Sequence, residues 1–192
     1  MFALENVTKK YGDKLVLDSM SFEFPDSGFV AISGRSGIGK TTMLNIIMGL
    51  EKADSGRVKW SGDTRPAISC VFQEDRLLER ESALENVLYV LKDRSEADNA
   101  RAREILTELG LGDELDTMAR DLSGGMARRV AIARALAYPA VVYIMDEPIK
   151  GLDAETRQQT LNTIKKWTAG RLLIMVSHNP EDAAGADVLL EM

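Results

Sequence analysis

The sequence has little cysteine and no long apolar run. Cys70 is its only cysteine in 192 residues, so an internal disulfide is excluded and a reducing, cytosolic environment is expected. A membrane-spanning helix needs about 18 apolar residues, whereas the most apolar stretch, 130–145, is interrupted by Arg134 and Pro139. The N-terminus lacks the basic and then apolar pattern of a signal peptide. We therefore expect neither a spanning segment nor export.

An excess of positive charge is also missing. The 24 Lys and Arg residues are outnumbered by 30 Asp and Glu residues, which leaves a net charge of −6. This balance argues against binding to nucleic acid or to an anionic membrane, because both require a positive field. The hydrophobic fraction of 45% and the charged fraction of 28% are typical of globular chains. The length fits one domain.

Strands and helices alternate along most of the chain. Strands are predicted at residues 2–7, 15–24, 29–33, 68–72, 140–145 and 171–176 and in a last segment that ends at 190. Helices are predicted at 41–50, 82–92, 96–109, 126–138 and 154–167, with a short one after 176. This alternation predicts an α/β fold with a mainly parallel, covered sheet. Residues 73–118 are predicted to form a mostly helical lobe inserted between sheet segments.

The strongest local motif follows the strand at 29–33. Residues 34–41 read Gly-Arg-Ser-Gly-Ile-Gly-Lys-Thr and match the phosphate-loop pattern G-x-x-x-x-G-K-[ST] between a strand and a helix. Glycines allow the backbone N–H groups to approach a phosphate, and the helix directs its positive end at the anion. Lys40 can reach the β- and γ-phosphates, and Thr41 can bring a hydroxyl to Mg²⁺. The predicted nucleotide-binding residues are Gly34, Arg35, Ser36, Gly37, Ile38, Gly39, Lys40, Thr41 and Thr42.

Two carboxylates, Asp146 and Glu147, end the apolar pattern of residues 141–145. At the carboxyl edge of a parallel sheet they would lie beside the phosphate loop. Asp146 is then expected to hold Mg²⁺, and Glu147 to act as the general base on the attacking water. The alternative is an acid that caps a strand-to-helix turn. The pairing with the phosphate loop favours the catalytic interpretation.

A Leu-Ser-Gly-Gly-Met segment, residues 122–126, precedes the predicted helix at 126–138. The start of a helix after such a turn can bind an anion, although Ser-Gly-Gly is also an ordinary helix-capping turn. The apolar stripe of the helix is expected to pack into the core. Arg128 and Arg129 are expected on its solvated face.

Together, these three motifs occur in the order and approximate spacing of the ATPase domain of ABC transporters, which the sequence resembles from residue 2 to about 190. The resemblance implies the P-loop NTPase fold, with a mainly parallel core sheet, an N-terminal antiparallel β-subdomain and an inserted helical subdomain. It implies one domain over 1–192, with the catalytic core and β-subdomain at 1–72 and 124–192 and the helical subdomain at about 73–123. No C-terminal regulatory domain is expected, because the sequence ends soon after His178.

The resemblance also assigns roles to residues outside the three motifs. Tyr11 would stack on adenine, and Gln73 would sense Mg²⁺ and the attacking water, joining Thr41 and Asp146 at the metal. His178 would contact the γ-phosphate, and Asp153 would lie in a loop that crosses to a partner subunit. The segment Leu122, Ser123, Gly124, Gly125 and Met126 would face the nucleotide of that partner. Taken alone, each of these residues has an ordinary structural alternative, such as a helix cap for Asp153.

Two positions depart from the family pattern. Met126 stands where Gln is commoner, and little effect is expected because Ser123 and the glycine backbone would make the phosphate contacts. Gly151 stands in the crossing loop where a small polar residue is frequent, so the sequence does not decide whether this loop communicates between the subunits.

The function implied is an Mg²⁺-dependent ATPase that works as a head-to-tail homodimer, closed by ATP and opened by hydrolysis. A separate transmembrane permease would bind near residues 74–80. The string Phe72-Gln73-x-x-Arg76-Leu77-Leu78 and the Met-ended signature resemble nitrate/sulfonate/taurine-type import ATPases. They favour import, with a substrate-binding protein as a further partner. The expected location is the cytoplasmic face of the membrane.

Three alternatives stay open. One is a non-transport ABC ATPase that acts on DNA or ribosomes, but residues 73–123 leave no room for a long coiled-coil arm, and only one ATPase domain is present. A second is a cargo-free regulatory ABC ATPase. A third is a small P-loop kinase, which would leave residues 122–126 and His178 unexplained.

Overall fold

The structure is a computed structural model that describes residues 2–62 and 64–192. Its centre is a five-stranded sheet in the order β5–β6–β7–β3–β8, in which all neighbouring strands run parallel. The strands are β3 (Gly28–Ser33), β5 (Ile68–Val71), β6 (Val142–Asp146), β7 (Leu172–Val176) and β8 (Val188–Glu191). The predicted parallel α/β core is therefore confirmed.

A second sheet is antiparallel and three-stranded, in the order β2–β1–β4. It contains β1 (Phe2–Tyr11), β2 (Lys14–Phe24) and β4 (Ser55–Trp60). The sequence patterns missed β4, because this edge strand is mostly polar and exposed and only Val58 and Trp60 are half-buried. Its pairing with β1 forms the strand, which no local pattern indicates.

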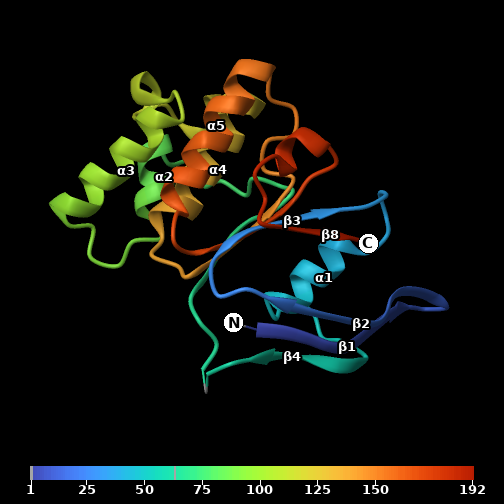
Figure 1. Ribbon diagram of the computed structural model, residues 1–192. Coiled ribbons are helices and arrows are strands. Elements are labelled where there is room, and N and C mark those ends of the chain that lie inside the picture. The colour runs from blue at the N-terminus through green and yellow to red at the C-terminus, as the bar shows by residue number, and fades with distance from the viewer. Residues whose placement is uncertain (1, 63) are drawn as a thin grey trace.

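In the described residues, five α-helices cover the two faces of the parallel sheet (Figure 1). They are α1 (Lys40–Ile47), α2 (Ala83–Leu88), α3 (Glu96–Glu108), α4 (Gly124–Ala137) and α5 (Ala154–Trp167), and short 3₁₀ turns lie at Gly112–Glu114, Ala119–Asp121 and Pro180–Ala183. Helix α1 lies between the two sheets, and helices α2 to α5 lie on the other face of the parallel sheet. The helices α1 and α2 are shorter than predicted. Gly49, in the left-handed region with φ 65°, stops α1.

The alternation of side chains along the central strands produces two separate cores. On β3, Val30 and Ile32 pack toward α1 and the antiparallel sheet, whereas Phe29 and Ala31 pack toward α2 to α5. Strands β6 and β7 are buried along their whole length. The carboxyl ends of β3, β6 and β7 are therefore held rigidly at one edge of the sheet.

The expectation that Arg128 and Arg129 lie on a solvated helix face is wrong. Arg128 is only 6% exposed, and Arg129 is half-buried and donates to the carbonyl of Leu109 at 2.7 Å. The reason is tertiary, because α4 packs against α2, α3, α5 and β5 and has little free surface. Within the described residues, no helix is both long and apolar enough to cross a bilayer.

Candidate functional site

The loop between β3 and α1 has the backbone geometry of a phosphate cradle. Gly34, Gly37 and Gly39 all have positive φ, at 150°, 76° and 116°. At Gly39, an added Cβ would lie 2.8 Å from Val16 Cγ1 and 2.9 Å from the Val16 carbonyl oxygen. Only glycine fits between the loop and β2. Gly39 also carries no side chain that could cap α1, so the first-turn N–H groups of the helix can serve an anion.

Lys40 and Thr41, the first two residues of α1, point back toward the loop and the sheet. The Lys40 ammonium is buried and donates to the carbonyls of Gly34 at 2.8 Å and Arg35 at 3.0 Å. The Thr41 hydroxyl donates to Asp146 Oδ2 at 2.6 Å. These contacts join the phosphate loop to the end of β6, as the parallel-sheet argument predicts.

Asp146 and Glu147 lie where β6 ends. Asp146 is 7% exposed and pairs with Val176 of β7. Glu147 follows in the left-handed region, with φ 50°, which is strained for a residue that has a Cβ. Its backbone N–H donates to the Val176 carbonyl at 3.0 Å. The chain thus turns sharply at Glu147, whose side chain projects beyond the sheet edge.

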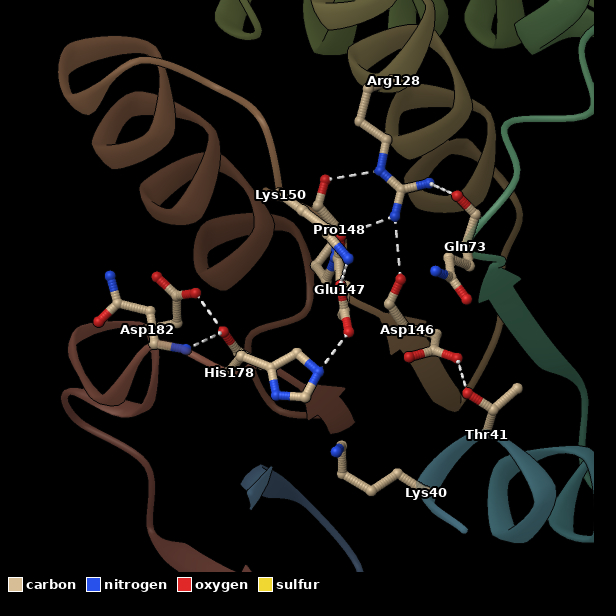
Figure 2. A network of polar contacts seen from close by, with 12 residues as sticks. Lys40, Thr41, Gln73, Arg128, Asp146, Glu147, Pro148, Lys150, His178 and Asp182 are labelled. Atoms are coloured by element: carbon tan, nitrogen blue, oxygen red, sulfur yellow. Dashed lines mark hydrogen bonds and ion pairs between the residues drawn. The ribbon is translucent and has the colours of Figure 1, made fainter. Parts of the chain in front are cut away.

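The Glu147 carboxylate lies between two basic groups (Figure 2). Oε1 is 2.7 Å from His178 Nε2, and Oε2 is 2.6 Å from Lys150 Nζ. Burial by itself raises the pKa of this carboxyl, but the contact with Lys150 and the charges of His178 and Lys40 outweigh burial, and the pKa falls below the ordinary value. The carboxylate is therefore ionised at neutral pH.

Most of the predicted site residues line one cavity of about 500 Å³. It is lined by Tyr11, Lys14, Val16, Ser36, Gly37, Gly39, Lys40, Thr41, Thr42, Gln73, Asp146, Glu147, Lys150 and His178. Its size is typical of small-molecule sites. Tyr11 is 47% exposed, and its hydroxyl donates to Glu51 Oε2 at 2.6 Å, which orients the ring.

The residues fit both ATP and Mg²⁺. The phosphate loop and Lys40 offer N–H donors and a positive charge to phosphates. Thr41, Gln73 and Asp146 line the same cavity, and their side chains carry the hydroxyl, amide and carboxylate oxygens that Mg²⁺ takes as ligands.

Other predicted residues lie outside the cavity. Among the described residues, none of Leu122 to Met126 lines it. Ser123 caps α4 and accepts a bond from the Met126 N–H at 3.3 Å. Asp153 caps α5 and accepts from the Thr156 N–H at 3.0 Å. Gly34, Arg35 and Ile38 complete the loop without lining the cavity.

Three contributions to the site were missed at the sequence level. Lys150 forms an ion pair with Glu147, and Arg128 donates to the carbonyls of Asp146 and Glu147 at 2.9 and 2.7 Å. Buried Asp182 accepts from the Ser177 hydroxyl and from Arg157 and so anchors the residue before His178. Arg128 is one of three arginines in an otherwise apolar helix, and no sequence signal distinguished it from Arg129 and Arg134.

Comparison with known proteins identifies the family of the chain. The ABC transporter family model matches residues 17–150. The hypophosphite import ATP-binding protein HtxD of Stutzerimonas stutzeri is 40% identical over 185 residues, which cover 84% of this chain and 54% of that protein. The aliphatic sulfonates import ATP-binding protein SsuB 1 of Mesorhizobium japonicum is 39% identical over 192 residues, which cover 95% of this chain and 71% of that protein. The chain thus spans about half the length of the first relative and more of the second.

A solved structure has the same architecture. It is the dimeric post-hydrolysis state of the ATP-binding cassette MJ0796 bound to ADP and Pi, with a TM-score of 0.88 and 32% identity. The match covers 100% of this chain and 94% of that one. The phosphate loop, the acid pair at the end of β6 and these similarities lead to one conclusion: the chain belongs to the ABC transporter family and has the ATP-binding domain of that family, with the P-loop NTPase fold.

Proposed function

We propose that the chain binds and hydrolyses Mg²⁺-ATP as the ATPase subunit of an ABC importer. The observation that carries the proposal is the position of Glu147. Its ionised carboxylate projects into the cavity that also contains Lys40, Thr41 and Asp146. A base, a phosphate-binding lysine and a pair of metal-binding oxygens thus share one space.

The loop residues bind the phosphates. The N–H groups of residues 36–42 and the Lys40 ammonium would hold the β- and γ-phosphates, and Lys40 would exchange its present carbonyl partners for phosphate oxygens. The Tyr11 ring, oriented by Glu51, offers a stacking surface for adenine. Mg²⁺, held by Thr41, Asp146 and Gln73, would supply charge neutralisation between the phosphates.

Glu147 would accept the proton of the water that attacks the γ-phosphate. Its lowered pKa keeps the carboxylate ionised, so that it can orient and deprotonate this water. Gln73 and His178 line the same cavity and would orient the water and the γ-phosphate. The present pairing of His178 with Glu147 would yield to the phosphate when ATP binds.

A second copy would complete the site. The segment Leu122 to Met126 lies away from the cavity of its own chain, and α4 begins there with the N–H groups of Gly124 and Gly125, ahead of the Met126 N–H that Ser123 caps. In a head-to-tail dimer this segment would face the γ-phosphate held by the partner's Lys40, with Asp153 in the crossing loop. ATP would then hold the two copies together until hydrolysis.

Transport requires a separate membrane permease. A groove of about 570 Å³ beside residues 74–80 includes the exposed side chains of Leu78 and Tyr89 and offers a docking surface for a helix of this permease. Import is supported by the two relatives, which are named import ATP-binding proteins. We further propose a substrate-binding protein as a partner, and a location at the cytoplasmic face of the membrane.

The Glu147→Gln variant tests the catalytic part of the proposal. We expect phosphate release to fall at least about 100-fold, because the amide cannot accept the proton, while ATP still drives dimer formation. Steady-state phosphate release and light scattering with Mg²⁺-ATP measure the two properties. Glu104→Gln, on the exposed surface of α3, is the control. Turnover near that of the parent chain would refute the general-base role.

The same variant tests the transport part. Glu147→Gln would be purified from native membranes with Mg²⁺-ATP, and its companions identified by mass spectrometry. A co-purified integral membrane protein supports the transporter subunit. Soluble partners or ribosomes alone would instead favour a non-transport ABC ATPase.

A further inference from the structure

The Arg128 guanidinium is the most densely bonded buried charge near the site. It is 6% exposed and lies on the second turn of α4. Nε donates to Pro148 O at 2.9 Å, Nη2 to Asp146 O at 2.9 Å and Glu147 O at 2.7 Å, and Nη1 to Phe72 O at 2.6 Å, Gln73 O at 3.3 Å and Asp75 Oδ1 at 2.9 Å. All five N–H groups of the side chain are thus in use.

These partners belong to two segments that are distant in sequence. One is the chain after β5, residues 72–75, which carries Gln73. The other is the turn after β6, residues 146–148, which carries Glu147. Strands β5 and β6 are neighbours in the sheet, but their pairing ends at Val71 and Met145, before either functional residue. Beyond the sheet edge, the Arg128 side chain bridges the two segments (Figure 2).

The turn at Glu147 needs this support. Its φ of 50° is strained for a residue with a Cβ, and the direction of the carboxylate depends on that backbone conformation. Arg128 Nη2 holds the carbonyls on both sides of the strained φ/ψ pair, those of Asp146 and Glu147. Each of the two peptide planes keeps one other backbone bond, from the Glu147 N–H to Val176 O at 3.0 Å and from the Lys150 N–H to Glu147 O at 3.3 Å. Loss of the Arg128 bonds would therefore loosen the turn and let the carboxylate shift.

We propose that Arg128 is a positioning residue for hydrolysis, which fixes the Glu147 carboxylate and Gln73 relative to each other through their backbone carbonyls. The proposal rests on the function proposed above, in which Glu147 is the general base. Arg128 itself does not line the nucleotide cavity and acts only through these two segments.

The test is a double-mutant cycle with Arg128→Met and Glu147→Gln. Methionine roughly preserves the volume and removes every donor. We expect kcat for ATP to fall about 100-fold, as it does when a catalytic group is misplaced by about 1 Å, and KM to change less than about threefold. Because Arg128 acts through Glu147, adding Arg128→Met to the Glu147→Gln variant should lower the hydrolysis rate of that variant by less than about threefold. Single-turnover measurements compare the two rates.

Further variants separate positioning from folding. Arg101→Met removes another half-buried arginine that donates to a carbonyl, Leu136 O at 3.1 Å, outside the site, and should keep the parent kcat. Arg128→Lys retains the charge and some of the bonds and should lose less activity than Arg128→Met. If Arg128→Met does not fold, Arg128→Lys takes its place in the cycle.

Three results would overturn the proposal. The first is a kcat of Arg128→Met within threefold of the parent. The second is an equal fall in hydrolysis rate when Arg128→Met is introduced into the parent and into Glu147→Gln. The third is a fall in kcat of the same size in Arg101→Met. Failure of the proposed function is distinguishable, because it appears as normal turnover in Glu147→Gln alone.

Discussion

Replacing Gly39 with alanine should show how closely the phosphate loop is packed against β2. The φ of Gly39 is 116°, and an added Cβ would meet Val16 Cγ1 at 2.8 Å, the Val16 carbonyl oxygen at 2.9 Å and Leu17 Cδ2 at 3.0 Å. One of these contacts is with backbone, and β2 is held along its length by β1. The loop therefore cannot relax without moving Lys40.

The expected cost has two parts. Placing a Cβ at this φ costs about 1–2 kcal/mol, and the overlap with a packed strand adds about 1–3 kcal/mol. We expect Gly39→Ala to lower the free energy of unfolding by about 3 kcal/mol, which corresponds to a melting temperature roughly 6–12 °C lower. Affinity for ATP should also fall, because the same loop carries the phosphate donors.

Gly37→Ala is the matched control in the same loop. Gly37 also has a positive φ, of 76°, but an added Cβ would meet no atom within 4 Å. Its substitution should cost only the conformational part, about 1–2 kcal/mol. Urea unfolding without nucleotide compares the two variants. Equal destabilisation, or a Gly39→Ala variant as stable as the parent, would refute the packing argument.

Two further predictions concern stability. Glu147→Gln should be less stable than the parent at pH 7, and the difference should vanish as the pH falls from 4.5 to below the lowered pKa of the folded protein, because the ionised carboxylate stabilises only above those values. Urea unfolding across this pH range measures it, and a difference that grows in acid would contradict it. Thr160→Val should raise stability by about 1 kcal/mol, since the buried Thr160 hydroxyl has no hydrogen-bond partner among the described residues. A loss of stability in thermal unfolding would disprove this.

Much of the architecture could be predicted locally. The apolar strands, the glycine pattern and the acid pair at 146–147 predicted a parallel sheet with a phosphate loop at its edge, because each signal is a property of a short segment. Strand β4 could not be predicted, since its exposed residues are ordered only by pairing with β1. The ends of α1 and α2 were also misplaced, as helix ends depend on capping and tertiary contacts.

The amino-acid order alone was enough for the type of chemistry: it placed a lysine, a hydroxyl and two carboxylates on strand-to-helix turns of one sheet. It was not enough for how those groups are held. The pairing of Glu147 with His178, and the burial of Arg128 between residues 72–75 and 146–148, join residues far apart in the chain. The Arg128 contacts arise only because α4 packs against β5 and the neighbouring helices, which buries an arginine, a residue type that is usually exposed. The Glu147–His178 pair forms only because the neighbouring strands β6 and β7 bring their carboxyl ends together.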